Sequence, residues 1–369
     1  MALAVLGQSE QGPTPQAPVP APPATPEPPP PPPPPPCLLG KVIECSFLGD
    51  VYYTKNFNEP SNGYNALYNF NVRANLAHLN MAKFSLEKPT GIFGFRVDVG
   101  AGQVYDVISA FDRAPDGMKY VHQAFIEIRP NHLHGVQFDF GKFVTSAGAE
   151  VIETNANWNY SRSLLFAWAI PYYHLGFRAT IPVTKSFTAG VQLVNGWNNV
   201  SDNNDGKTLG LVANYTWKKV TWSNNYYTGP ENDDTNKGFR NLYDTTILVN
   251  PTDKLSAYLN FDYATNKLVN TTNKWSGVAV AARYQLTKQL AIAPRVEVFS
   301  DKNGYSTGTA QRLTEFTLTG EVKVIKYLVT RLEYRRDNSD QAFFGRSAKE
   351  GFSKSQSTFT VGMFAYFGK

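Results

Sequence analysis

The chain has 369 residues, of which 42% are hydrophobic, 14% are aromatic and only 18% are charged, against about 25% charged residues in an ordinary soluble domain. This mixture excludes a disordered chain and a coiled coil. The formal net charge of +5 is spread along the chain, so no nucleic-acid partner is expected. The longest apolar run, residues 164–170, is far shorter than the roughly 20 residues that a membrane-spanning helix needs. Transmembrane helices are therefore excluded, but transmembrane strands are not.

The N-terminal part of the sequence differs from the rest in composition. Residues 1–12 are interpreted as the remnant of a signal segment, because residues 1–7 are apolar but short and carry no Lys or Arg. Residues 13–45 are predicted to be a proline-rich, disordered periplasmic linker, since 16 of the residues 13–36 are proline. It could be a solvated spacer or a contact to the cell wall. Cys37 and Cys45 could form a disulfide or stay reduced, and their spacing leaves both alternatives open.

From residue 46 onward the sequence alternates with a period of two residues, as β-strands do. In residues 93–100, for example, Phe93, Phe95, Val97 and Val99 share one face, and Gly, Arg and Asp residues occupy the other. The same alternation recurs in residues 187–193, 208–217, 255–263 and 328–335. Proline residues fall between such segments, where they would not interrupt a ladder of hydrogen bonds.

The connections between these segments alternate between short and long. Seven short turns are predicted around residues 88–90, 130–134, 182–185, 218–219, 250–253, 287–288 and 325–326. Eight long loops are predicted at about residues 55–67, 102–118, 145–170, 197–206, 229–240, 265–273, 300–310 and 338–354. Together they join 16 strands in an even-numbered meander that can close on itself. We therefore predict an all-β fold, a 16-stranded antiparallel transmembrane β-barrel over residues 46–369.

Three features favour a membrane barrel over a soluble sandwich: the loop asymmetry, strands of about ten residues, and aromatic residues near strand ends. The candidates for such an interfacial girdle are Tyr172, Tyr173, Tyr215, Trp217, Trp222, Tyr226, Trp275 and Tyr334. In a membrane the apolar faces contact lipid and the polar faces line the lumen. The predicted location is the bacterial outer membrane, with both termini in the periplasm.

Four motifs resemble a known family, the OmpL-like family of β-barrel porins called porin-2. They are residues 84–90 (FSLEKPT), residues 94–100 (GFRVDVG), residues 141–145 (GKFVT) with Gly148 and Glu150, and residues 159–163 (NYSRS). The resemblance implies a barrel that lets small hydrophilic solutes diffuse and that carries no catalytic residues. Such barrels commonly end on an aromatic residue that the barrel-insertion machinery recognises. Here Phe367 is followed by Gly368 and Lys369, which departs from that pattern.

The alternation also predicts which charged side chains line the pore. They are Arg96, Asp98, Glu127, Arg129, Asp139, Arg178, Asp262, Arg283, Arg295, Glu297, Glu321, Lys323, Arg331, Glu333 and Arg335. Opposed charges of this kind create a transverse field in a pore, and the slight excess of basic over acidic residues favours anions. The alternative is that they pair with charges on adjacent strands and stiffen the wall.

The third long loop is the candidate for a constriction of the pore. It carries Glu150, Glu153, Tyr160 and Arg162, and its carboxylates could face Arg96, Arg178, Arg283 or Arg295 across a narrow opening. The alternative is a lid that packs on the rim or against a neighbour in a trimer.

Other chemistry is not expected from the sequence. His132 and His134 lie in a short turn without a Cys, Asp or Glu to complete a metal site, so neither a metal nor a cofactor is predicted. Ser161, Ser163 and His174 could supply parts of a hydrolytic site, but no nucleophile motif surrounds them. The predicted function is a porin for passive diffusion of small hydrophilic solutes and ions. The alternatives are a non-conducting outer-membrane anchor and, less favoured, a hydrolase. The expected partners are outer-membrane lipid, the solutes and the insertion machinery acting on the C-terminal strand, with a homotrimer inferred from the size of the barrel.

Overall fold

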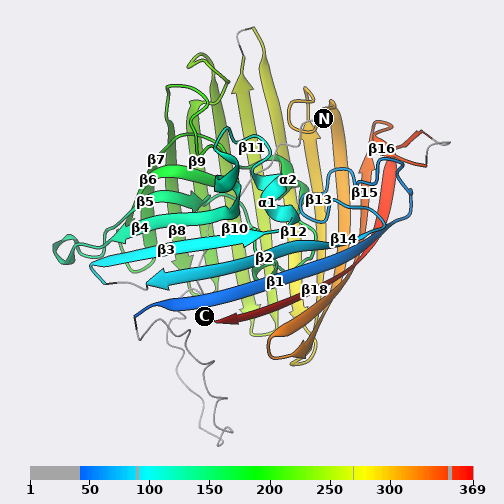
Figure 1. Ribbon diagram of the computed structural model, residues 1–369, viewed down its shortest axis with the longest axis horizontal. Helices are drawn as coiled ribbons and strands as arrows, with labels where there is room; N and C mark the ends of the chain where they lie inside the picture. The colour runs from blue at the N-terminus through cyan, green and yellow to red at the C-terminus, as the bar shows by residue number, and fades with distance from the viewer. Residues whose placement is uncertain (1–41, 89–90, 269, 348–350, 369) are drawn as a thin grey trace, which may run out of the picture.

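The computed structural model describes residues 42–88, 91–268, 270–347 and 351–368. The predictions for the signal remnant and for most of the proline-rich linker, and the pairing of Cys37 with Cys45, involve residues outside these ranges. Within the described residues, no helix has the length and hydropathy that crossing a bilayer would require. Most of the described residues lie in β-strands (Figure 1).

Sixteen strands form one closed antiparallel barrel in which each strand pairs with its neighbours in the chain. They are β1 (Glu44–Asn56), β2 (Ala77–Lys88), β3 (Phe93–Ala101), β4 (Val121–Ile128), β5 (Gln137–Val144), β6 (Tyr173–Pro182), β7 (Phe187–Val194), β8 (Thr208–Trp217), β9 (Val220–Pro230), β10 (Phe239–Thr252), β11 (Leu255–Lys267), β12 (Thr272–Gln285), β13 (Leu290–Asp301), β14 (Gln311–Ile325), β15 (Leu328–Ser339) and β18 (Ser355–Gly368). The barrel closes where β1 pairs with β18, with Ser46 opposite Gly368. The strands β16 (Phe344–Gly345) and β17 (Phe352–Ser353) form a separate two-stranded sheet in the last long loop.

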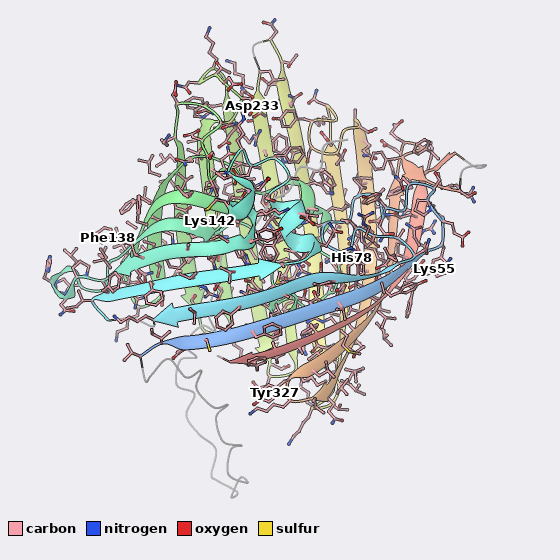
Figure 2. All side chains as sticks on the ribbon, viewed as in Figure 1. Lys55, His78, Phe138, Lys142, Asp233 and Tyr327 are labelled. Atoms are coloured by element: carbon pink, nitrogen blue, oxygen red, sulfur yellow. The ribbon has the colours of Figure 1, made fainter. Side chains whose placement is uncertain are left out.

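The prediction of 16 strands joined alternately by short turns and long loops is confirmed. Phe138, near the start of β5, and Tyr327, between β14 and β15, lie at the short-turn end, and Asp233 lies in a long loop (Figure 2). The sixth long loop is shorter than predicted, because β11 and β12 stay paired as far as Lys267 and Thr272.

The two faces of the barrel wall have the inverted polarity that a membrane barrel requires. On β14, Phe316 and Leu318 are 42% and 44% exposed on the outer face, whereas Glu315 and Thr317, which alternate with them along the strand, are buried inside. Apolar side chains on the outside suit hydrocarbon, and closure of the sheet leaves no edge with unpaired backbone groups.

Five of the eight predicted girdle aromatics, Tyr215, Trp217, Trp222, Tyr226 and Tyr334, are exposed on the outer surface. The prediction is wrong for the other three. Tyr172, Tyr173 and Trp275 are buried, with at most 3% exposure, and belong to an apolar cluster inside the barrel. Each donates its polar hydrogen to an interior partner: Tyr172 to Asn69, Tyr173 to Asp112 and the Trp275 indole to the Ala169 carbonyl. The polar groups of these rings therefore have hydrogen-bond partners inside the protein, whereas those of an interfacial residue would bond to water.

The interior of the barrel contains folded loops. We call residues 57–76 loop L1 and residues 145–172 loop L3. L3 carries the 3-10 helix η3 (Thr154–Ala156) and α2 (Leu164–Trp168), which contacts β12 and β13. The helix α1 (Gln103–Ile108) lies against β2, and Figure 1 shows both helices within the outline of the barrel. Two further 3-10 helices, η1 (Asp116–Tyr120) and η2 (Asn131–Leu133), precede β4 and β5.

Candidate functional site: the lumen and loop L3

L3 has a defined conformation because its own side chains satisfy its backbone. The Arg162 guanidinium donates hydrogen bonds to the carbonyl oxygens of Val151, Ile152 and Tyr160, at 2.7 to 2.8 Å. The Ser163 hydroxyl accepts a hydrogen bond from the Phe166 amide and thereby caps α2. A loop within a barrel needs such partners, since an unpaired buried backbone group costs as much as a lost hydrogen bond.

Two arginines on β15 hold L3 against the wall. Arg331 donates to the carbonyl oxygens of Thr154, Asn157 and Asn159, and its Nη2 lies 2.8 Å from a carboxylate oxygen of Glu321. Arg335 donates to the Arg162 carbonyl at 2.7 Å and pairs with Asp337. Both arginines are 1% exposed. Both guanidinium groups are therefore paired with carboxylates and hydrogen-bonded to the backbone of L3.

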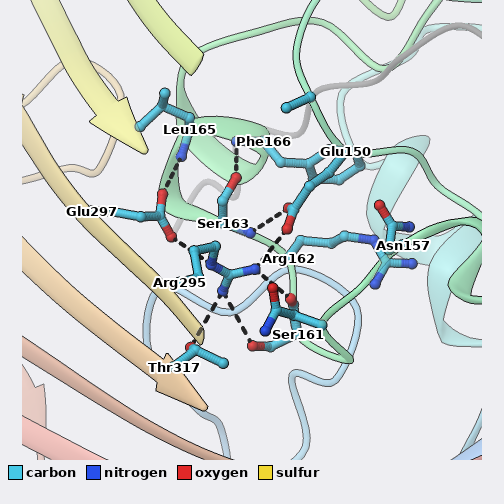
Figure 3. Close-up of polar contacts among 12 residues, drawn as sticks. Glu150, Asn157, Ser161, Arg162, Ser163, Leu165, Phe166, Arg295, Glu297 and Thr317 are labelled. Carbon is cyan, nitrogen blue, oxygen red and sulfur yellow. Dashed lines mark hydrogen bonds and ion pairs between the residues drawn. The ribbon is translucent and has the colours of Figure 1, made fainter. Parts of the chain in front are cut away.

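Arg295 on β13 lies at the centre of a second set of contacts (Figure 3). Its Nη1 is 2.6 Å from Glu150 of L3, and its Nε is 3.1 Å from Glu297 and 3.3 Å from Glu315. Glu150 also accepts a hydrogen bond from the Ser163 amide, and Glu297 accepts one from the Leu165 amide. A buried charge is tolerated only when it is paired and hydrogen-bonded in this way.

Carboxylates of the wall bind the middle of L3. Glu333 on β15 accepts hydrogen bonds from the amides of Tyr160 and Ser161, at 2.6 and 2.9 Å. Asp50 on β1 accepts one from the Tyr160 hydroxyl at 2.8 Å. Acidic residues therefore contribute to docking L3 as much as basic residues do.

Glu153 of L3 also binds the wall, since its carboxylate is 2.6 Å from the Lys83 ammonium of β2. We call this ion pair the Glu153 anchor. Burial raises the pKa of Glu153, but the charge of Lys83 and the hydrogen bond from it outweigh burial and lower this pKa to about 2. Asp98 and His122 complete a cluster whose ligand atoms all lie within 4.8 Å of one another. These residue types can bind a metal ion, but the Lys83 ammonium already provides a positive charge next to both carboxylates. Nothing in the sequence spacing pointed to this cluster.

Loop L1 packs on L3 from the other side. Phe70 contacts the Phe166 ring edge-on, with ring centroids 5.6 Å apart. The Arg162 guanidinium lies 5.3 Å from the centroid of the Phe70 ring. The Trp168 indole donates to the Leu67 carbonyl. Tyr68 lies under Arg335, whose guanidinium is 4.3 Å from the Tyr68 ring centroid. L1 and L3 therefore form one apolar core with the wall, a feature that the sequence analysis did not predict.

Glycines on the inner face of the wall make room for the loops. A Cβ atom at Gly362 of β18 would lie 2.1 Å from the Tyr160 ring, and one at Gly277 of β12 would lie 2.7 Å from Leu165. Gly100 of β3 is likewise covered by Tyr105 of α1. A glycine at a lumen-facing position of a strand was the available sequence signal for a docked side chain.

L3 touches β9 and β11 through hydrogen bonds from Ser146 to Tyr227 and from Ala149 to Asn260, and it leaves two cavities along β5–β11. One cavity of about 200 Å³ is lined by residues of β5–β8 and by Ser146. A second cavity, of about 210 Å³, lies between L3 and β9–β11 and also reaches Ser146. Their linings are dominated by neutral residues, among them Thr180, Thr188, Gly190, Gln192, Asn214, Thr221, Ser223 and Thr246. The free space therefore borders a wall that carries little charge.

The other residues predicted to line the pore are distributed around the wall. Arg96, Glu127, Arg129, Arg178 and Arg283 are half-buried, whereas Asp98, Asp139 and Asp262 are buried. Most are close to an opposite charge: Arg96 to Asp98, Arg129 to Glu127, Arg178 to Asp139 and Arg283 to Glu321. Four arginines were predicted to face the carboxylates of L3. Among them, Arg295 is in direct contact with Glu150 of L3.

The candidates for hydrolysis have other partners. His174 is buried, with its ring nitrogens 2.9 Å from the Gly196 carbonyl and 3.0 Å from the Thr145 hydroxyl. The Ser163 hydroxyl caps α2, and the Ser161 hydroxyl lies 3.5 Å from Arg295. These contacts are structural, and His132 and His134 are exposed in the short turn between β4 and β5.

Comparison with known proteins now adds to this geometry. The model of the family described as "Putative beta-barrel porin-2, OmpL-like" matches residues 45–367. The chain belongs to this family. The barrel is therefore a porin of the bacterial outer membrane. A comparison with curated proteins found no match.

Several solved structures share the fold. They include OmpT of Vibrio cholerae in its trimer form (12% identity, 88% of this chain and 99% of that chain, TM-score 0.58). The outer-membrane channel DcaP of Acinetobacter baumannii matches with 10% identity, 88% and 97% coverage and a TM-score of 0.58. An anion-selective porin from Comamonas acidovorans matches with 10% identity, 88% and 99% coverage and a TM-score of 0.58. At such identities these matches establish the 16-stranded porin fold alone.

Proposed function

We propose that this porin lets small hydrophilic solutes and ions diffuse passively along the β5–β11 side of its lumen. L3, with Glu150, Glu153, Tyr160 and Arg162, would form the constriction. The observation that carries the proposal is the asymmetry of the lumen. Most ion pairs and arginine contacts of L3 go to β1, β2, β13 and β15, and both cavities lie along β5–β11. On that side L3 keeps neutral hydrogen bonds, from Ser146 to Tyr227 and from Ala149 to Asn260.

This arrangement predicts weak charge selectivity. The slight excess of basic residues along the wall favours anions only if those residues face the passage, but Arg295, Arg331 and Arg335 are paired and covered by L3. The charge next to the open space consists mainly of the Asp139 and Arg178 pair. A pore whose charges are compensated exerts little net field on a passing ion.

The test is the single-channel conductance of the refolded protein in a planar bilayer, with the reversal potential measured under a salt gradient. We expect discrete current steps, smaller than an unobstructed 16-stranded barrel would give, and a reversal potential close to zero. A large reversal potential of either sign would contradict the neutral passage. Insertion without current would instead favour the non-conducting anchor, in which L1 and L3 close the lumen.

The remaining features of the proposal concern assembly and orientation. We infer that the termini and short turns face the periplasm, and that the insertion machinery recognises β18. A homotrimer is supported by the trimer form of the V. cholerae structure with the same fold. No catalytic or cofactor function is included, because Ser161, Ser163 and His174 have structural partners.

A further inference from the structure

The cavity between L3 and β9–β11 combines an aromatic side with a polar side. Trp158 of L3 and Tyr258 of β11 lie against each other, with ring centroids 5.1 Å apart and ring planes inclined by 33°. Thr221, Ser223 and Thr246 contribute hydroxyl groups from the lumen faces of β9 and β10. The cavity measures about 210 Å³, which suits a ligand smaller than the drug-sized molecules that fill pockets of about 300 to 1,000 Å³.

The lining of this cavity offers little to an ion. It contains no Lys or Arg among the described residues, and its only carboxylate belongs to Glu150. That carboxylate is already bound by Arg295, by the Ser163 amide and by the Tyr258 hydroxyl. A charged solute would therefore lose hydration in the cavity without gaining an opposite charge.

A neutral polar ligand would find a partner here. The Thr246 hydroxyl is buried and has no hydrogen-bond partner among the described residues. Buried polar atoms are nearly always paired, and Thr246 lines the cavity, so rotation of its side chain toward a ligand hydroxyl would supply the missing hydrogen bond. The aromatic side calls for a ligand that also has an apolar face, because the ring faces carry negative charge density that attracts weakly positive C–H groups.

We propose that this cavity is a binding subsite for a cyclic sugar of monosaccharide size, which stacks on the Trp158 ring, backed by Tyr258, and hydrogen-bonds to Thr246. A sugar ring has C–H groups on its faces and hydroxyls on its rim, and it carries no charge. The proposal rests on the proposed function and assigns a solute class to the passage beside L3.

The experiment uses the full chain in a planar bilayer, with D-glucose as the cyclic probe and D-sorbitol as its open-chain counterpart. We expect glucose to reduce the ion current in a saturable manner, and sorbitol to do so only at concentrations about fivefold higher. Trp158→Ala should raise the half-blocking concentration of glucose about fivefold, the equivalent of about 1 kcal/mol for a ring contact. Trp158→Phe, which keeps a ring, should retain most of the block.

Two further variants make the outcome decisive. Trp217→Ala removes a tryptophan from the outer surface, where its side chain is 54% exposed, and should leave the glucose block unchanged. Thr246→Val removes the unpaired hydroxyl without touching L3 and should weaken the block even if Trp158→Ala fails to fold. Equal block by glucose and sorbitol in a conducting pore, or an unchanged block in both cavity variants, would overturn the subsite. The absence of any current would refute the proposed function instead.

Discussion

The buried arginines of the wall bind loop L3 and do not face an open pore. Arg331 is the clearest case, because it pairs with Glu321 and donates to three backbone carbonyls of L3. The sequence predicted that Arg331 faces inward, since the alternation along β15 fixes its face. Its partners in L3 lie more than 170 residues away in the chain, and no local pattern identifies them.

The variant Arg331→Ala tests this role. It leaves Glu321 and the carbonyls of L3 buried without their partner, and breaking a buried pair in this way costs about 3–5 kcal/mol. We expect a lower unfolding temperature of the barrel and a larger, noisier single-channel current as L3 loosens. Arg336→Ala is the control, because Arg336 is exposed and bonds to the Ser355 and Ser357 hydroxyls. Equal effects of the two variants would show that Arg331 does not hold L3.

The Glu153 anchor predicts how L3 responds to acid. The pKa of this carboxyl is lowered to about 2, so its contribution to stability is complete above its ordinary value near 4.5 and is lost as the pH falls through about 2. L3 should therefore stay anchored between pH 7 and pH 4, and we expect the noise of the single-channel current to stay constant over this range. An increase in noise on acidification to pH 4 that Glu153→Gln abolishes would contradict the anchor.

At the scale of elements, L3 and L1 fold into the barrel because the wall has a surface whose shape matches them. Gly362, Gly277 and Gly100 face loop side chains at distances that exclude even a methyl group. The alternation predicted which strands exist but not which loops fold inward, because the inward position depends on packing between distant segments. Tyr172, Tyr173 and Trp275 illustrate this limit: their aromatic character fits an interfacial girdle equally well, and only their interior partners distinguish the two locations.

The variant Gly362→Val examines this fit. A side chain at this position would displace the Tyr160 ring and break the hydrogen bond from Tyr160 to Asp50. We expect faster cleavage within L3 by an added protease and a larger current, while the barrel itself still forms. Gly320→Val serves as the control, since the nearest atom to a Cβ there lies at 3.9 Å. Equal resistance of L3 to cleavage in both variants would show that L3 does not pack against Gly362.

For the whole molecule, the count, order and connection pattern of the strands follow from local signals. Period-two alternation marks each strand, and prolines and short polar turns mark where a strand ends. Closure between β1 and β18 brings together residues more than 300 apart, yet it was predictable because an open sheet cannot exist in hydrocarbon.

Removal of β18 tests closure directly. A chain that ends at residue 354 leaves β1 and β15 with free edges, and each unpaired backbone group costs several kcal/mol in a bilayer. We expect this variant to form no channels and to lose the heat-dependent shift in gel mobility that marks a folded barrel. A chain that begins at residue 42 keeps every barrel strand and should fold like the full chain. Channel formation without β18 would refute the closed barrel.

The contacts of L3 also set an order of events during assembly. L3 precedes β6 in the chain, yet its partners Arg295, Glu333 and Arg331 belong to strands that are made more than 100 residues later. Until those strands arrive, L3 can bind only to earlier strands, as Glu153 does to Lys83 and Tyr160 to Asp50, while Glu150 lacks its wall partner. Contacts between segments this far apart in the chain form late. The interior is thus completed last, so a half-inserted barrel would hold L3 only by its contacts to the early strands, and docking would be complete only when β13–β15 are in place.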